Sequence, residues 1–332
     1  MNKWYNSQGN NSDVVLSSKI RLVRNLNKTP FPCKMSNELR KSVCKKIFAA
    51  LQNSELAGEF DLIELNTLSD IQKIALAEKG CISAQMAKQN SYGAVLLSKD
   101  ESVSIMLCEE DHICMSVMNA GEDLKSAYHK ADKIDNVLIK NMKIAFDKKL
   151  GFLTSNPMQL GTGMRASTVL HLPAVGERHM VASLSTMLSK LGFSLKPLYS
   201  GKGNFFELSN EISLGITEEN ALDNLTAICD QIIAQERKLR TELMEYADFE
   251  DKIFRAVGTL KMARKLSTGE FLEMISLARL GVAMSSFDIS YEKIGDMIHL
   301  LGTASIISSA EGELTPDDAD RIRAQYVREN IE

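Results

Sequence analysis

The stretch Leu-Gly-Thr-Gly-Met-Arg-Ala-Ser-Thr-Val-Leu-His-Leu-Pro, residues 160–173, is the most informative part of this sequence. Two glycines precede Arg165, and the residues around Val169 predict a strand after them. Glycine lets backbone N–H groups approach an anion, and arginine offers a charged fork that matches phosphate oxygens. The stretch has neither the third glycine and opening helix of a dinucleotide fingerprint nor the Gly-Lys-Ser/Thr of a Walker loop. It indicates a different kind of anion-binding loop, with an ordinary tight turn as the alternative.

A second unusual segment is Ser17-Ser18-Lys19-Ile20-Arg21-Leu22-Val23-Arg24, which follows a short apolar run. Side chains alternate across a strand, so Lys19 and Arg21 are expected on one face and Ile20 and Leu22 on the other. Cations that converge on one face suit phosphate oxygens. The alternative is a solvated edge strand whose positive charge deters aggregation.

The third segment is Cys108-Glu109-Glu110-Asp111-His112, which comes after the apolar run 103–107. That run and 94–97 flank a polar turn, so they predict a β-hairpin. Polar side chains at the end of such a strand can face a cleft and can include a general base. The alternative is a charged turn that leaves the sheet, with His112 as a hydrogen-bonded structural residue.

Composition excludes several classes of protein without naming a function. The chain has 332 residues, of which 44% are apolar and 25% charged, as in ordinary globular proteins. A net charge of −4 gives no bulk attraction to nucleic acid or anionic lipid. No apolar run reaches the ~18 residues of a membrane helix, and the N-terminus has no signal core. The six cysteines form no C-x-x-C pair, which argues against structural zinc and favours reduced thiols in the cytoplasm.

Hydrophobic periodicity divides the chain near residue 245. An α+β part is expected before this point, and only helices are expected after it. In the first part the pattern predicts helices over 36–56, 69–79, 119–149 and 175–191, and a long helix from 217. Besides the strands already named, short strands are predicted over 60–65, 193–199, 204–208 and 212–214.

The three segments, in this order and approximate spacing, resemble the ATP:guanido phosphotransferases. Gln235-Glu236-Arg237 and Arg279-Leu280-Gly281 are similar to that family as well. Creatine and free-arginine kinases carry a helical domain before the Ser-Ser-Arg strand, whereas here that strand begins near residue 17 and helices follow at the C-terminus. This arrangement looks like the bacterial protein-arginine kinases. The resemblance implies an antiparallel sheet flanked by helices in a catalytic domain over 1–245, and a helical C-terminal domain over 246–332.

The resemblance also implies roles for particular residues. Glu110 matches the catalytic carboxylate that faces the guanidinium group. In the C-terminal helix, Asp320 and Arg323 match a phosphoarginine pocket, although Ala319 replaces its first arginine. The family implies ATP with Mg²⁺ held mainly through the nucleotide phosphates, and no metal ligand is assigned in the chain. The residues implied in nucleotide binding are Ser17, Ser18, Lys19, Ile20, Arg21, Arg165, Ala166, Ser167, Thr168, Val169 and Lys196.

The sequence departs from the family pattern inside the site. Lys19 and Lys196 replace arginines, Cys114 replaces a third, and the loop 200–204 lacks about four residues, including a carboxylate that grips the guanidinium. Lysine keeps the charge but loses the bidentate fork, and removal of one oriented contact in such a site costs about 10²–10³ in rate. We therefore expect ATP-dependent phosphorylation of protein arginine side chains, which these departures could make weak. The alternatives are a catalytically inactive relative that binds phosphoarginine or a regulatory partner, and a small-guanidine kinase.

The resemblance implies partners and a compartment as well. It implies protein substrates bearing arginine, a zinc-binding activator protein, a Clp-type chaperone–protease that reads the mark, and self-association into a homodimer. Neither nucleic acid nor a membrane is expected as a partner, and the expected location is the cytoplasm.

Overall fold

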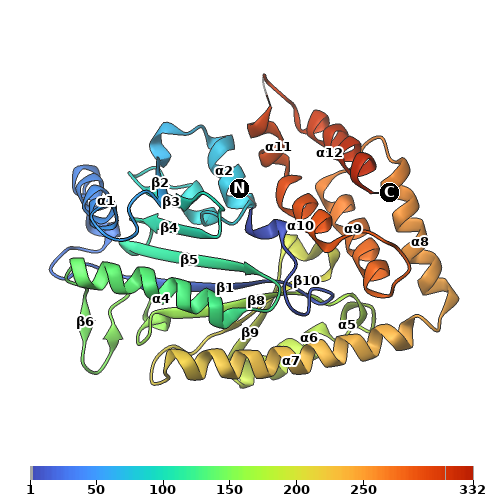
Figure 1. Cartoon of the computed structure of the whole chain (residues 1–332), viewed down its shortest axis with the longest axis horizontal. Helices are drawn as coiled ribbons and strands as arrows, with labels where there is room; N and C mark the ends of the chain where they lie inside the picture. Colours follow the sequence, from blue (N-terminus) through green and yellow to red (C-terminus); the bar gives the residue numbers. More distant parts are fainter. Residues whose placement is uncertain (1–2, 311, 332) are drawn as a thin grey trace.

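An antiparallel eight-stranded sheet forms the centre of the computed structural model, which describes residues 3–310 and 312–331 (Figure 1). The strand order is β2-β3-β4-β5-β1-β8-β10-β9, so β1 and β8 are central neighbours although they are far apart in the sequence. This architecture confirms the predicted α+β class. The strands are β1 (Val15–Arg24), β2 (Phe60–Glu64), β3 (Ala94–Ser98), β4 (Val103–Leu107), β5 (Ile113–Ala120), β8 (Met164–His171), β9 (Phe193–Pro197) and β10 (Phe205–Asn210).

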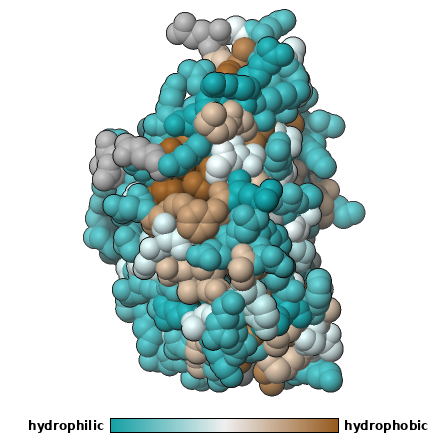
Figure 2. Space-filling view, turned by 90° about the vertical axis from the view of Figure 1, so that its right-hand side faces the viewer, coloured by the Kyte–Doolittle hydropathy of each residue, from teal (hydrophilic) through white to brown (hydrophobic). Residues whose placement is uncertain are grey.

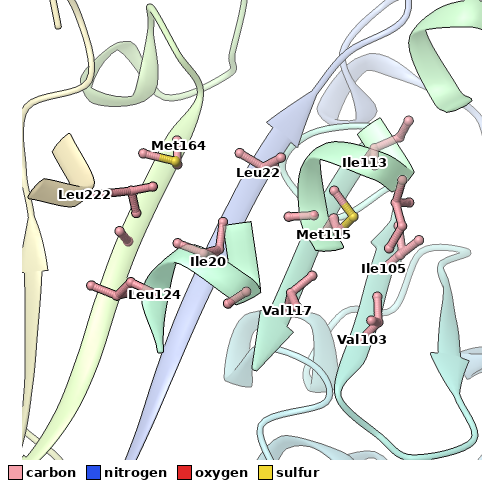
Figure 3. Close-up of a cluster of buried hydrophobic side chains, with 14 of the residues drawn as sticks. Ile20, Leu22, Val103, Ile105, Ile113, Met115, Val117, Leu124, Met164 and Leu222 are labelled. Atoms are coloured by element: carbon pink, nitrogen blue, oxygen red, sulfur yellow. The ribbon is translucent and has the colours of Figure 1, made fainter. Parts of the chain in front are cut away.

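The apolar face of β1 packs on the main hydrophobic core. Ile20 and Leu22 point to this face, together with Met164 of β8 and Met115 of β5 (Figure 3). The long helices α4 (Leu124–Asn141) and α7 (Glu218–Leu243) pack on this core, with α4 drawn across β1 and α7 along the bottom of Figure 1, and α1 (Asn37–Gln52) packs beside α4. Because alternation sends Ile20 and Leu22 into this core, it leaves Lys19 and Arg21 on the opposite face.

That opposite face is covered only in part. At one end of the sheet, α2 (Asp70–Glu78) and α3 (Ala84–Ala87) pack over β3, β4 and β5. At the other end lie the C-terminal helices, which enclose a second core. Between these two covers the central strands present their polar side chains. The C-terminal helices are α8 (Ala247–Met262), α9 (Thr268–Ala283), α10 (Tyr291–Leu300), α11 (Thr303–Ser309) and α12 (Pro316–Asn330).

Several local predictions were wrong. The expected helix over 119–149 begins only at Leu124, because 113–120 forms β5 and Asp123 caps α4. After α4 the chain forms a small hairpin of β6 (Phe146–Asp147) and β7 (Gly151–Phe152). The expected helix over 175–191 is two helices, α5 (Pro173–Glu177) and α6 (Val181–Lys190), separated where His179 takes a positive φ of 56°. The expected strand over 212–214 is absent from this described stretch.

The face formed by the C-terminal helices is mainly hydrophilic, with apolar residues gathered in small groups (Figure 2). No helix within residues 3–310 and 312–331 is long and apolar enough to cross a bilayer.

Candidate functional site

The sheet carries four cationic side chains on one face, three of them on the central strands β1 and β8. Arg21 of β1 pairs with Arg165 of β8, and Lys19 pairs with Ser167 one step further along the same strands. Lys196 lies on β9, two strands beyond β8. Residues that pair directly across antiparallel strands share a face, so Lys19, Arg21 and Arg165 form a cationic surface of the kind that binds phosphate oxygens.

Arg21 is held by two neighbours at the β5 side of this surface. Its Nε donates to the Cys114 Sγ at 2.7 Å, and one terminal nitrogen lies 3.6 Å from the Glu109 carboxylate. Burial raises the pKa of the Cys114 thiol, so that residue is a neutral contact. Cys114 therefore orients Arg21 but adds no positive charge where the family pattern has an arginine.

The loop before β5 uses three of its four polar residues structurally. Glu109 is buried and accepts a hydrogen bond from Ser83. Asp111 accepts from Asn25 Nδ2 at 2.6 Å and from the Ser155 N–H at 2.7 Å. Glu110 is partly exposed, and the only hydrogen bond of its side chain among the described residues is a long one of 3.5 Å from the Gln85 amide. Glu110 is thus the carboxylate of this loop that stays available to a ligand.

His112 serves the fold of the loop and is not a base. Its Nδ1 accepts from the Leu26 N–H at 3.2 Å, and its Nε2 lies 2.8 Å from the Pro30 carbonyl oxygen. An Nδ1 that accepts and an Nε2 that donates describe a neutral ring. Burial lowers the pKa of His112, in agreement with that state. The structural alternative for His112 is therefore the correct one.

A carboxylate that the sequence analysis did not consider lies between two of the cations. One oxygen of Glu211 is 3.4 Å from an Arg165 terminal nitrogen and 3.5 Å from the Lys196 Nζ. Arg165 also donates to the Ser209 hydroxyl at 2.6 Å. A second carboxylate, that of Glu207, accepts from the Ser167 hydroxyl at 3.0 Å. The spacing of two residues between Glu207, Ser209 and Glu211 was the available signal, since it predicts a shared face in an extended chain, and Glu211 directly follows the end of β10.

The predicted nucleotide residues divide between the two faces of the sheet. Ser17, Lys19, Arg21, Arg165, Ser167 and Val169 share the open face through the pairing of β1 with β8. The side chains of Ile20 and Ala166 are buried in the core, and Thr168 contacts Cys229 of α7. Ser18 donates to the Gly121 carbonyl oxygen. These four side chains therefore face away from the cationic surface.

A cavity of about 250 Å³ adjoins the cationic surface at its C-terminal-helix end. Ser17, Lys19 and Val169 line it from the sheet, and Tyr291 and His299 line it from α10. Its lining is more apolar than polar, in contrast to the cationic surface. A cationic surface and a more apolar hollow therefore lie next to each other on the open face of the sheet.

The shortened loop 200–204 folds onto the C-terminal helices. Lys202 pairs with Glu273 of α9 at 2.6 Å. Gly203 has a φ of 76°, and a Cβ there would lie 2.5 Å from the Leu272 carbonyl oxygen. The loop is therefore fixed against α9. Lys202 pairs with a residue of that helix and does not join the cationic surface.

Arg323 and Asp320, the residues matched to a phosphoarginine pocket, are adjacent in α12. The Arg323 side chain is 0% exposed and donates to the carbonyl oxygens of Leu301 and Leu266, at 2.7 and 2.6 Å. It also donates to Asp320 at 2.6 Å and to the Thr303 hydroxyl at 2.9 Å. A ligand that reached Arg323 would have to displace one of these partners.

No group of three or more potential metal ligands is found within the described residues.

Comparisons with known proteins agree with this geometry. The sequence model described as the C-terminal catalytic domain of ATP:guanido phosphotransferase matches residues 42–239, and that of the protein-arginine kinase McsB C-terminal domain matches residues 246–332. The chain is 34% identical to a protein-arginine kinase of Clostridium tetani, over 100% of this chain and 99% of the relative. It is 37% identical to a protein-arginine kinase of Pelotomaculum thermopropionicum, over 98% and 94% respectively.

Solved structures show the same fold at lower sequence identity. A lombricine kinase matches with a TM-score of 0.61 and 18% identity, covering 71% of this chain and 69% of that one. A duplicated taurocyamine kinase from Schistosoma mansoni also matches with a TM-score of 0.61, at 22% identity, covering 78% of this chain and 38% of that one. On the full-length sequence matches and the match to the catalytic-domain model, this chain belongs to the ATP:guanido phosphotransferase family, in its protein-arginine kinase branch.

Proposed function

We propose that this protein transfers the γ-phosphoryl group of ATP to arginine side chains of proteins. The observation that carries the proposal is the position of Glu110. Its carboxylate has no close partner in the described structure, while the loop that carries it contacts Arg21 of the cationic surface through Glu109. The names of the full-length relatives support the choice of a protein arginine as the acceptor.

The proposed reaction needs a group that orients and deprotonates the acceptor. A guanidinium group is protonated at neutral pH and is a poor nucleophile. Glu110 would hold the guanidinium in line with the γ-phosphorus and accept the proton lost as the N–P bond forms. The bond from the γ-phosphorus to the bridging oxygen breaks, and ADP leaves. Lys19, Arg21, Arg165 and Lys196 would bind the triphosphate, and Mg²⁺ would be held mainly through the phosphates.

The apolar hollow beside Val169 suits the nucleoside. With the triphosphate on Lys19, Arg21 and Arg165, the remainder of the nucleotide would extend along β1 and β8 toward Ser17 and the cavity. There it would meet residues of α10.

The direct test is an assay for acid-labile phosphate. The purified chain is incubated with Mg-ATP and an arginine-rich protein, and the product is examined by mass spectrometry for phosphoarginine. Acid-labile phosphoarginine supports the proposal. Binding of ADP without any product, at millimolar nucleotide and extended times, contradicts it.

A second candidate is a catalytically inactive protein that binds phosphoarginine or a regulatory partner. It is favoured by Cys114, which is neutral, and by Glu211, which forms ion pairs with both Arg165 and Lys196. We propose the region of Asp320 and Arg323 as its binding pocket. Calorimetric titration with phosphoarginine, repeated with Asp320→Ala, tests this candidate independently of catalysis. The zinc-binding activator, the Clp-type partner and the homodimer stay predictions from the resemblance.

The contacts of Glu211 lead to a prediction about nucleotide affinity. Removal of its charge should free Arg165 and Lys196 for phosphate. Partly exposed ion pairs contribute below ~1 kcal/mol each, so we expect Glu211→Gln to tighten ATP binding by roughly 3-fold. The dissociation constant is measured by calorimetry, with Glu242→Gln on the exposed face of α7 as a matched loss of charge. Equal or weaker binding by the Glu211 variant would show that these contacts do not compete with the nucleotide.

A further inference from the structure

The segment of residues 70–87, which contains α2 and α3 and is named the α2–α3 segment, meets both adjacent carboxylates of the active-site loop. Ser83 caps α3, and its hydroxyl donates to a carboxylate oxygen of Glu109. Two residues later, the Gln85 amide lies 3.5 Å from Glu110. The segment therefore contacts Glu110 directly, and contacts Arg21 of the cationic surface through Glu109.

The other end of the α2–α3 segment is fastened to the C-terminal helices. One oxygen of Glu78 accepts from the Ala304 N–H at 3.1 Å, and the other accepts from the Ser305 N–H at 2.8 Å and the Ser305 hydroxyl at 2.9 Å. Gly302 makes this approach possible, since a Cβ at that position would lie 2.2 Å from the Glu78 carboxylate. The first residues of α11 are thus bound to the last residue of α2.

The two ends are joined by a short and ordered connection. Glu78 and Ser83 are separated by four residues, of which Cys81 and Ile82 are buried. The Cys81 N–H donates to the Leu76 carbonyl oxygen at 2.9 Å, which folds this connection back on α2. Ile82 packs in the apolar cluster beneath the segment, together with Cys114 of β5. Because this connection is short and packed, we expect a displacement of α11 to be transmitted to Ser83.

We propose that Ser83 and Gln85 are positioning residues for phosphoryl transfer, which hold Glu109 and Glu110 in place, and that Glu78 makes this positioning depend on the C-terminal helices. The proposal rests on the proposed function for its catalytic consequence, but the physical link between Glu78 and the loop 108–112 does not. Enzymes are sensitive to small misplacements of a catalytic group, so a loosened loop should lower kcat. Gln85 contacts Glu110 and does not line the cavity, so its loss should leave the KM for ATP nearly unchanged, whereas Ser83 also acts on Arg21 through Glu109.

The first arm of the experiment tests the positioning residues. Gln85→Ala should lower kcat roughly 3- to 10-fold, as expected for one neutral hydrogen-bond partner, and should leave the KM for ATP within about 2-fold. Ser83→Ala should lower kcat by about 10-fold or more because its acceptor is charged, and Ser83→Thr should restore most of it because the hydroxyl is kept. A wild-type kcat in both alanine variants, or a loss that appears only as a higher KM for ATP, overturns the positioning role.

The second arm tests the link to the C-terminal helices. Glu78→Ala removes the carboxylate, and Gly302→Ala displaces it through a steric clash while residue 78 stays a glutamate. Asp70→Asn, an exposed carboxylate at the start of α2, is the matched control. Both Glu78→Ala and Gly302→Ala should lower kcat several-fold and speed hydrogen–deuterium exchange of the amides at 108–112. In the wild type, the Cys108 N–H is bonded to the His112 carbonyl oxygen and the His112 N–H to Asn25. The control should match the wild type.

The outcomes separate this inference from the proposed function. If the wild type forms phosphoarginine but Glu78→Ala and Gly302→Ala keep its kcat and its exchange rates, the coupling is wrong and the kinase assignment stands. If the wild type forms no phosphoarginine, the kinase assignment fails. The hydrogen–deuterium exchange rates at 108–112 then test the coupling by themselves. Unchanged protection at 108–112 in both variants then overturns the coupling, and faster exchange in both, with Asp70→Asn unchanged, supports it.

Discussion

Glu110→Gln should abolish most phosphoryl transfer while leaving nucleotide binding intact. The glutamine side chain has nearly the same shape, but it cannot accept the proton that the guanidinium loses. Removal of a general base typically costs about 10²–10⁴ in rate. Because Glu110 is partly exposed and has a single long contact to Gln85, its replacement should not disturb the fold. Initial rates of phosphoarginine formation and the calorimetric dissociation constant for ADP measure the two effects separately.

The neighbours of Glu110 provide contrasts for this result. Asp111→Asn should reduce stability, since Asp111 accepts from Asn25 and from the Ser155 N–H, but should leave the rate per folded molecule close to that of the wild type. Glu109→Gln should lower kcat, because it weakens the hydrogen bond from Ser83, and should also raise the KM for ATP, because Glu109 contacts Arg21. If Asp111→Asn were as inactive as Glu110→Gln at full folding, or if Glu110→Gln kept more than a tenth of the rate, the assignment of the base would be wrong.

The central part of the fold could be predicted because its signals are local. The alternation of Lys19 and Arg21 with Ile20 and Leu22 predicts a strand with one apolar and one cationic face, and β1 has both. The residues of β5 give no such pattern, because Ile113–Val117 is buried on both faces. Methionine, cysteine and serine in this run are also not among the residue types that are enriched in strands. The strand was therefore missed, and the helix predicted next to it was too long.

Only those site residues that belong to sequence motifs could be predicted. The motif residues Arg21 and Arg165 become partners through antiparallel pairing, which the motifs imply. The roles of Glu211, Ser83 and Gln85 depend instead on strand register and on how α2 and α3 pack over the sheet. These are long-range features that no local pattern encodes. The same reason explains why the sequence could not predict the link between Glu78 and α11.

Glu236→Gln should strongly destabilise the fold, because it breaks a fully buried ion pair. Glu236 is 0% exposed and accepts from the Ala174 N–H at 3.0 Å and the Val175 N–H at 2.9 Å, at the start of α5. It also accepts from Arg240 Nε at 2.7 Å. Arg240 is 2% exposed, donates to the carbonyl oxygens of Asp13 and His171, and has the Asp13 carboxylate 3.8 Å away.

Removal of the charge of Glu236 leaves the buried Arg240 guanidinium with only the more distant and partly exposed Asp13 carboxylate as counter-ion. Breaking a buried pair in this way typically costs about 3–5 kcal/mol of stability, which is more than an exposed ion pair contributes. The same change at Glu242 removes an exposed contact of 3.9 Å to Lys238, and should cost less than about 0.5 kcal/mol. Both residues lie on α7, so the pair of variants controls for helix propensity.

Urea unfolding followed by circular dichroism measures both variants. The Glu236 variant should unfold at a clearly lower urea concentration, and the Glu242 variant at nearly the wild-type midpoint. Because the cost comes from a buried cation that has lost its nearest counter-ion, Glu236→Gln combined with Arg240→Met should be less destabilised than the sum of the two single variants. A strictly additive double variant would mean that Glu236 acts only through the N–H groups of α5. In that case the ordered junction between β8 and α5 depends on those two hydrogen bonds, and the ion pair contributes nothing to it.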